Sequence, residues 1–254
     1  MITVPELAAG ALEEFLGSYM RRRFGSSQAH LAEIVPSAAR SALECIGNSD
    51  ALYHNLEHTL LVTLAGHDIL RGRTLYCNVS ADDYAHVIIA CLTHDIGYVR
   101  GLFKEDDDAG FVIDPTGKKV KLPRGSSDAS LLPYHVNRSK LYVMERIEGI
   151  ALLDKKRIAG AIEGTRFPTS VLGEEQEYEE EASIVRAADF IGHAHRDERV
   201  AAPVGEPWKS GYDRRPSAAV DDIARSRSRE RARCTIAPAA LRLCKLIGVR
   251  HSCR

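Results

Sequence analysis

Two segments in the first half of the chain are apolar on several helical faces, at residues 56–71 and 84–93. A helix that is apolar all round has no face to offer to water, so it belongs in the middle of a domain. Other helices must cover it, and several segments have apolar side chains at helical spacing. These segments are residues 7–19, 31–45, 139–153, 154–164 and 177–193. The sequence therefore predicts an all-α bundle built around buried helices.

One stretch interrupts the helical pattern. Residues 111–122 place Asp114, Pro115, Thr116 and Gly117 between two short runs with β propensity. Proline at the second position and glycine at the fourth are typical of a type I turn. We expect a small β-hairpin over residues 111–122, inserted in a loop of about 30 residues. Loops of this length are often lids or binding loops, and disorder is the common alternative.

The composition changes near residue 195. Residues 1–195 hold 28 acidic and 20 basic side chains, and residues 196–254 hold 7 and 14, so the formal charge of −1 averages two opposite segments. Residues 225–233 read RSRSRERAR, and helical periodicity fades before them. We expect one domain at residues 1–195 and a basic low-complexity tail at residues 196–254. The tail could be a disordered extension, a nucleic-acid-binding patch or an out-of-frame end.

Composition excludes several classes of protein. Apolar residues make up 44% of the chain and charged residues 27%, which permits a packed core and excludes wholesale disorder. No apolar run approaches the roughly 20 residues of a bilayer crossing, and the N-terminus lacks a secretory signal pattern. The six cysteines form no CxxC pair, which argues against a zinc ribbon, a redox motif and a disulfide scaffold. We expect a cytoplasmic protein.

Three separated segments carry side chains that could share a metal ion. Residues 53–58 read YHNLEH, residues 94–97 read HDIG, and Asp189 lies within RAADFIG. His58 and Asp189 each share a helical face with apolar side chains, so both are predicted to point inward. An inward carboxylate needs a cation, a metal ion or hydrogen-bond donors.

The His-Asp dipeptide occurs twice in the chain. His94 and Asp95 follow the second apolar segment and precede Gly97, which can end a helix in a left-handed conformation. This pair is therefore predicted at the mouth of a buried helix. His67 and Asp68 have no such helix-end signal beside them, so we leave them outside the predicted site.

Two imidazoles and two carboxylates make a mixed nitrogen and oxygen donor set. The set comprises His58, His94, Asp95 and Asp189. It suits one or two ions of Mn²⁺, Fe, Zn²⁺ or Co²⁺, or Mg²⁺ where water completes the shell. The alternative is that each histidine is satisfied separately in the core.

The order His, His-Asp, Asp over residues 50–193 resembles the HD-domain superfamily of metal-dependent phosphohydrolases. YHNLEH is similar to the YHNxxH signature of cyclic nucleotide phosphodiesterases, and HDIGYVRG, DASLLPYHVNRSKL, TRFP and RAADFIG resemble a bacterial HD-domain group. The resemblance implies an HD-domain helical bundle whose metal ligands are His58, His94, Asp95 and Asp189. Asp95 would bridge wherever a second ion binds. His54 would protonate the leaving oxygen, and its alternative is a structural role at the helix start.

Other polar residues are further candidates. His135 could complete a second metal site, as extra histidines do in some HD enzymes, or it could be a loop histidine without a ligand role. A guanidinium group matches the oxygens of phosphate. The candidates to bind phosphate are Arg100, Arg138 and Arg166, each of which could be exposed or salt-bridged instead. His193 and His195 have no supporting pattern, so we leave them outside the predicted site.

These residues predict a metal-dependent phosphohydrolase that cleaves a phosphoester of a nucleotide or cyclic nucleotide. Metal-activated water would be the nucleophile and His54 the general acid. The partner would be a small phosphorylated substrate, with no membrane contact, and nucleic acid could bind only through the basic tail. The alternative is a non-catalytic module that senses a nucleotide. The substrate, the type of ester, the metal and the oligomeric state stay open.

Overall fold

The structure, a computed structural model, describes residues 2–166 and 179–200. This part of the chain contains seven α-helices, three short 3-10 helices and one two-stranded sheet. The helices are α1 (Val4–Phe24), α2 (Leu31–Ile46), α3 (Leu56–Arg73), α4 (Ala81–Thr93), α5 (His135–Arg146), α6 (Lys155–Glu163) and α7 (Glu179–Val200). The predicted all-α fold with a small hairpin is confirmed.

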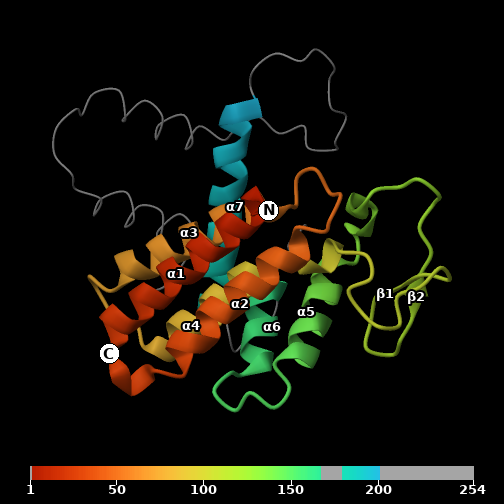
Figure 1. Cartoon of the computed structure of the whole chain (residues 1–254). Coiled ribbons are helices and arrows are strands. Elements are labelled where there is room, and N and C mark those ends of the chain that lie inside the picture. Colours follow the sequence, from red (N-terminus) through yellow and green to blue (C-terminus); the bar gives the residue numbers. More distant parts are fainter. Residues whose placement is uncertain (1, 167–178, 201–254) are drawn as a thin grey trace.

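Helix α4 is the centre of the bundle (Figure 1). Every residue from Tyr84 to Thr93 is buried, and the helix packs against α2, α3, α6 and α7. Ser80 caps its N-terminus, where the Ser80 hydroxyl accepts a hydrogen bond from the Asp83 amide and Asp83 bonds back. The buried helix predicted from the apolar run at residues 84–93 is therefore confirmed.

The remaining helices cover this centre from several sides. Helices α1 and α2 lie side by side; α2 packs against α4, and Tyr19 and Phe24 of α1 contact the Tyr84 ring of α4. Helices α5 and α6 pair, and α6 packs against α4. Helix α7 packs along α3 and also contacts α4 and α6. His58 on α3, Asp189 on α7 and the His94-Asp95 pair just after α4 thus meet in the interior.

The small sheet stands at one side of the bundle (Figure 1). Strands β1 (Phe111–Val112) and β2 (Lys119–Val120) are antiparallel, with Phe111 opposite Val120 and Val112 opposite Lys119. The turn between them closes through a 3.1 Å hydrogen bond from the Gly117 amide to the Asp114 carbonyl. Gly117 has a φ of 80°, which a side chain rarely tolerates. The predicted hairpin is confirmed.

The boundaries of α5 differ from the prediction. The sequence pattern indicated a helix over residues 139–153, but α5 spans His135–Arg146. It can begin earlier because Pro133 lies just before it, where no helical N–H is needed. It ends earlier because Gly149 adopts a φ of 83°, which an α-helix does not contain.

The predicted tail falls almost wholly outside the described residues. Only residues 196–200 belong to the structure, as the last residues of α7. Among the helices that the structure describes, none combines the length and apolarity of a membrane span.

Candidate metal centre

Four side chains converge where α3, the end of α4 and α7 meet. His58 Nε2 lies 3.3 Å from Asp95 Oδ2 and 3.2 Å from Asp189 Oδ1. His94 Nε2 faces the same two oxygens, at 3.2 Å and 3.6 Å. His58, His94 and Asp95 are at most 3% exposed, and the Asp189 side chain is 17% exposed. The structure therefore brings together the four residues predicted as metal ligands.

The spacings among these atoms suit a shared ion. Atoms that ligate one ion at about 2.1 Å lie about 3.0 Å apart at right angles and about 3.4 Å apart in a tetrahedron. Both ring nitrogens of His58, Nε2 of His94 and Oδ1 of Asp189 are buried and have no hydrogen-bond partner among the described residues. Unpaired buried polar atoms are costly, and a cation would satisfy all of these except His58 Nδ1. The donor set fits a divalent ion.

Backbone contacts orient two of the imidazoles. His94 Nδ1 is 2.8 Å from the Cys91 carbonyl, so it carries the proton and leaves the Nε2 lone pair facing the carboxylates. His135 repeats this arrangement, with Nδ1 2.6 Å from the Leu132 carbonyl and Nε2 3.8 Å from Asp95 Oδ1. Such contacts fix the ring and the tautomer of histidines that bind metals. The structure thus brings His135, at the start of α5, to the edge of the cluster.

Gly97 makes this approach possible. The sequence predicted a left-handed helix end there, which is wrong: α4 ends at Thr93, and Gly97 lies in the 3-10 turn Ile96–Tyr98 without a positive φ. The glycine is needed for space instead, because a Cβ on it would lie 2.0 Å from the His135 carbonyl oxygen. Its amide donates to Ser139 Oγ at 2.9 Å, which holds α5 in place.

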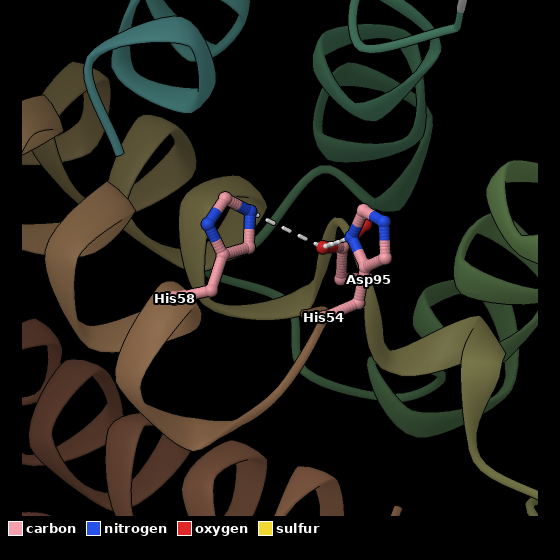
Figure 2. A group of neighbouring side chains, drawn as sticks. All are labelled: His54, His58 and Asp95. Atoms are coloured by element: carbon pink, nitrogen blue, oxygen red, sulfur yellow. Dashed lines mark hydrogen bonds and ion pairs between the residues drawn. The ribbon is translucent and has the colours of Figure 1, made fainter. Parts of the chain in front are cut away.

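His54 approaches Asp95 from outside the cluster. Its Nδ1 lies 2.8 Å from Asp95 Oδ2, the oxygen that also faces His58 (Figure 2). The Asn55 side chain caps α3 by accepting a 3.2 Å hydrogen bond from the His58 amide, which places His54 just before the helix. The Tyr98 ring stacks on His54 at 4.3 Å. His54 is 21% exposed, so it lies at the solvent edge of the site.

The charges within the cluster shift one another's protonation. Burial alone lowers the pKa of His94, but the Asp95 and Asp189 carboxylates together raise it well above its usual value. The pKa of His58 is also raised, for the same reasons. Burial favours neutral carboxyls, yet the facing imidazoles hold the pKa of Asp95 and of Asp189 well below the usual range. Protons therefore compete with a metal ion for these imidazole nitrogens.

The sequence patterns missed two residues of this site, His193 and Tyr53. His193 Nε2 lies 3.2 Å from Asp189 Oδ1, and its Nδ1 is hydrogen-bonded to the Tyr53 hydroxyl. Two groups of residues around the site each have ligand atoms within 4.8 Å of one another. One group is His54, His58 and Asp95, and the other is His58, Asp189 and His193. The available signal was the four-residue spacing of Asp189 and His193, which puts both on one face of a helix. The His195 side chain lies outside the described residues.

The three arginines predicted to bind phosphate are paired with protein groups. Arg138 is fully buried, and its five N–H donors bond to the Asp106 carboxylate and to three backbone carbonyls. Those bonds would have to break for Arg138 to bind phosphate. Arg100 pairs with Asp50 and Asp128, and Arg166 with Glu163. For these two, phosphate binding stays a prediction.

The other His-Asp dipeptide lies apart from the site. His67 is 4% exposed, and its Nδ1 is 2.7 Å from the Tyr84 hydroxyl. Phe15 and Tyr19 pack edge-on against the same ring, and Asp68 is exposed. His67 is a core histidine satisfied by a neighbour.

Comparison with known proteins gives one result. A family model described as Npun_R2479-like matches residues 4–201, a range that includes every residue of the cluster. No curated protein and no solved structure matches the chain.

Proposed function

This chain belongs to the Npun_R2479-like family, and we propose that it is a metal-dependent phosphohydrolase acting on a nucleotide or cyclic nucleotide. One observation carries the proposal: two imidazoles and two carboxylates meet at 3.2–3.6 Å in the interior with unpaired donor atoms. Their order along the chain, His58, His94-Asp95 and Asp189, resembles that of HD-domain phosphohydrolases. The residues suit Mn²⁺, Fe, Zn²⁺, Co²⁺ or hydrated Mg²⁺.

The ion and the protein have separate tasks in this proposal. A divalent ion lowers the pKa of water and polarises a phosphoryl oxygen. His58, His94, Asp95 and Asp189 would hold such an ion. Helix α4 and its neighbours keep the ligands rigid, because the residues around them are buried and closely packed.

His54 is the proposed proton donor to the leaving oxygen. Asp95 accepts its Nδ1–H, which orients the ring and leaves Nε2 as the atom that can transfer a proton. Tyr98 stacks against one face and limits rotation of the ring. Because His54 is partly exposed, Nε2 can reach a substrate that enters from solvent.

His135 lies on the same side of Asp95 as His54, and it is the proposed ligand for a second ion. Its Nε2 is 3.8 Å from Asp95 Oδ1, whereas Asp95 Oδ2 faces His58 and His94. The two oxygens of one carboxylate could therefore serve two ions. Burial lowers the pKa of His135, so the ring is neutral at physiological pH and keeps a lone pair available.

The proposal is tested by metal content and turnover together. The purified protein is analysed for bound metal and assayed with bis-p-nitrophenyl phosphate and Mn²⁺. We expect bound metal and hydrolysis in the wild type, and a loss of both by more than about 100-fold in His94→Ala. His30→Ala, which removes an exposed histidine at the start of α2, should match the wild type.

Two outcomes would contradict the proposal. A folded wild type that holds no metal and shows no turnover refutes it. A nucleotide that raises the melting temperature without being hydrolysed would instead support a sensing module.

A further inference from the structure

His193 lies at the centre without belonging to the His, His-Asp, Asp pattern. It follows Asp189 by one turn of α7, and its Nε2 is 3.2 Å from Asp189 Oδ1. That spacing equals the one between Asp189 Oδ1 and His58 Nε2. The ring centres of His58 and His193 are 4.7 Å apart, and the ligand atoms of the three residues lie within 4.8 Å of one another.

We infer that His193 is an additional ligand of the metal centre, an inference that rests on the proposed function. The orientation of its ring is the first argument. Asp189 Oδ1 has no hydrogen-bond partner although His193 Nε2 lies only 3.2 Å away. An imidazole that served to hold Asp189 would direct its N–H at that oxygen. Here the nitrogen lies beside the oxygen, as two ligands of one ion do.

The contact with Tyr53 is the second argument. Tyr53 stacks on His193, with ring centres 4.7 Å apart and an angle of 14° between the planes. Its hydroxyl bonds to His193 Nδ1. When Nδ1–H donates to this hydroxyl, the lone pair of Nε2 is free for an ion. Histidines that bind metals commonly donate the other N–H in this way.

Close packing of α7 on α3 is the third argument. Gly192 has no room for a side chain, because a Cβ there would lie 2.7 Å from Val62 and 3.4 Å from the His58 ring. The glycine lets the backbone beside His193 approach His58. The 33% exposure of His193 places it at the solvent edge of the centre, on the α7 side.

Cobalt provides a test that does not depend on turnover. Co²⁺ is titrated into the full-length protein, and its visible absorption spectrum and Kd are measured. We expect His193→Ala to raise the Kd by about 10- to 100-fold and to change the spectrum, because one nitrogen ligand is lost. Tyr53→Phe keeps the stacking but removes the hydroxyl, so we expect a smaller rise, of up to about 10-fold. His30→Ala is the matched control.

The outcomes separate this inference from the proposed function. If His94→Ala loses Co²⁺ while His193→Ala keeps the Kd and spectrum of the wild type, the inference is wrong and the proposed centre stands. If the wild type binds no Co²⁺, Mn²⁺ or Zn²⁺, both are wrong. His193→Asn is measured alongside, with circular dichroism of each apo variant, so that loss of binding is not confused with loss of folding.

Discussion

Two of the buried charged regions that the structure describes differ in how their polar atoms are paired. Around Arg138, each of the five N–H donors has an acceptor, and the Asp106 side chain that faces it is fully enclosed. Around Asp95 and Asp189, the facing imidazole nitrogens of His58 and His94 have no hydrogen bonds among the described residues. A buried charge that only supports the fold is expected to be fully paired. The unpaired donor atoms of this cluster are thus the feature that supports the proposed metal site.

The two regions are joined at one turn. The Gly97 carbonyl accepts a 2.7 Å hydrogen bond from Arg138 Nε, and the Gly97 amide bonds to Ser139. Ser139 Oγ in turn donates to the His94 carbonyl at 2.6 Å. The paired region thus holds the backbone beside the candidate metal centre.

Removal of the buried guanidinium should have the largest effect on stability. Arg138→Met leaves the buried Asp106 carboxylate without its charged partner, with only the Val112 and Phe103 amides donating to it, which costs about 3–5 kcal/mol. Urea unfolding in the absence of metal measures this loss. Arg146→Met, on the exposed side of the same helix, should change the free energy of unfolding by less than about 1 kcal/mol. Equal losses in the two variants would contradict the role given to Arg138.

A side chain at the joining turn should disturb both regions. In Gly97→Ala the new Cβ meets the His135 carbonyl, so α5 must move, at a cost of about 1–3 kcal/mol. Urea unfolding again measures the loss, and we also expect weaker Mn²⁺ binding by calorimetry. Gly72→Ala, in α3 with open space around it, should gain about 0.5–1 kcal/mol. If Gly97→Ala changed neither the free energy of unfolding nor Mn²⁺ binding, the close approach of Gly97 to the His135 carbonyl would be unimportant.

Metal affinity should rise with pH at the unpaired cluster. Neighbouring carboxylates raise the pKa of His58 and His94 above 6.5, so an ion must displace protons from both rings. Above about pH 6.5, each rise of one pH unit lowers the Kd about tenfold, or about 1.4 kcal/mol, for each proton that the ion displaces. This dependence ends once the pH exceeds the pKa of the imidazole in the folded protein. Calorimetry with Mn²⁺ at several pH values measures this. A Kd that is constant with pH contradicts the model of competing protons.

The stability of the metal-free protein should fall as the pH rises, whereas its metal affinity should increase. A histidine whose pKa is raised on folding stabilises the folded state fully at pH values below its unfolded-state pKa of about 6.5. This stabilisation is lost as the pH rises through its folded-state pKa. The free energy of unfolding without metal should therefore fall over this range. The apo His94→Ala variant should show a smaller pH dependence in the same urea series.

The smallest effect is expected at the histidine outside the site. Tyr84→Phe removes the hydroxyl that satisfies His67 Nδ1, at a cost of about 1 kcal/mol. Metal binding should not change, because the His67 ring contacts Phe15, Tyr19 and Tyr84 rather than the residues of the cluster. A change in the Kd for Mn²⁺ would show that the two His-Asp dipeptides are coupled.

Local patterns were enough to predict much of the fold. The apolar run that became α4 and the Asp114–Gly117 turn were visible in the sequence because both depend on neighbouring residues. The end of α5 was misplaced because it depends on the backbone conformation of Gly149, and Gly97 was misread because its constraint comes from His135, far along the chain. Contacts between distant segments leave no local signal.

The same limit applies to the candidate site. His58, His94, Asp95 and Asp189 could be chosen because inward-facing polar residues stand out on apolar helices. Arg138 could not be recognised as a structural residue, since its acceptors come from the loop at residues 97–112. His193 was left out although its four-residue spacing from Asp189 is visible, because the contact of its Nδ1 with Tyr53, 140 positions away, leaves no signal in the sequence.

The central claim is that the unpaired cluster binds a divalent ion, and equilibrium unfolding tests it most directly. The free energy of unfolding is measured by urea for the wild type and His94→Ala, each with and without Mn²⁺ at about 1,000 times the Kd. We expect Mn²⁺ to raise the free energy of unfolding by about 4 kcal/mol in the wild type and not to raise it in His94→Ala. No gain in the wild type, or an equal gain in both proteins, would contradict it.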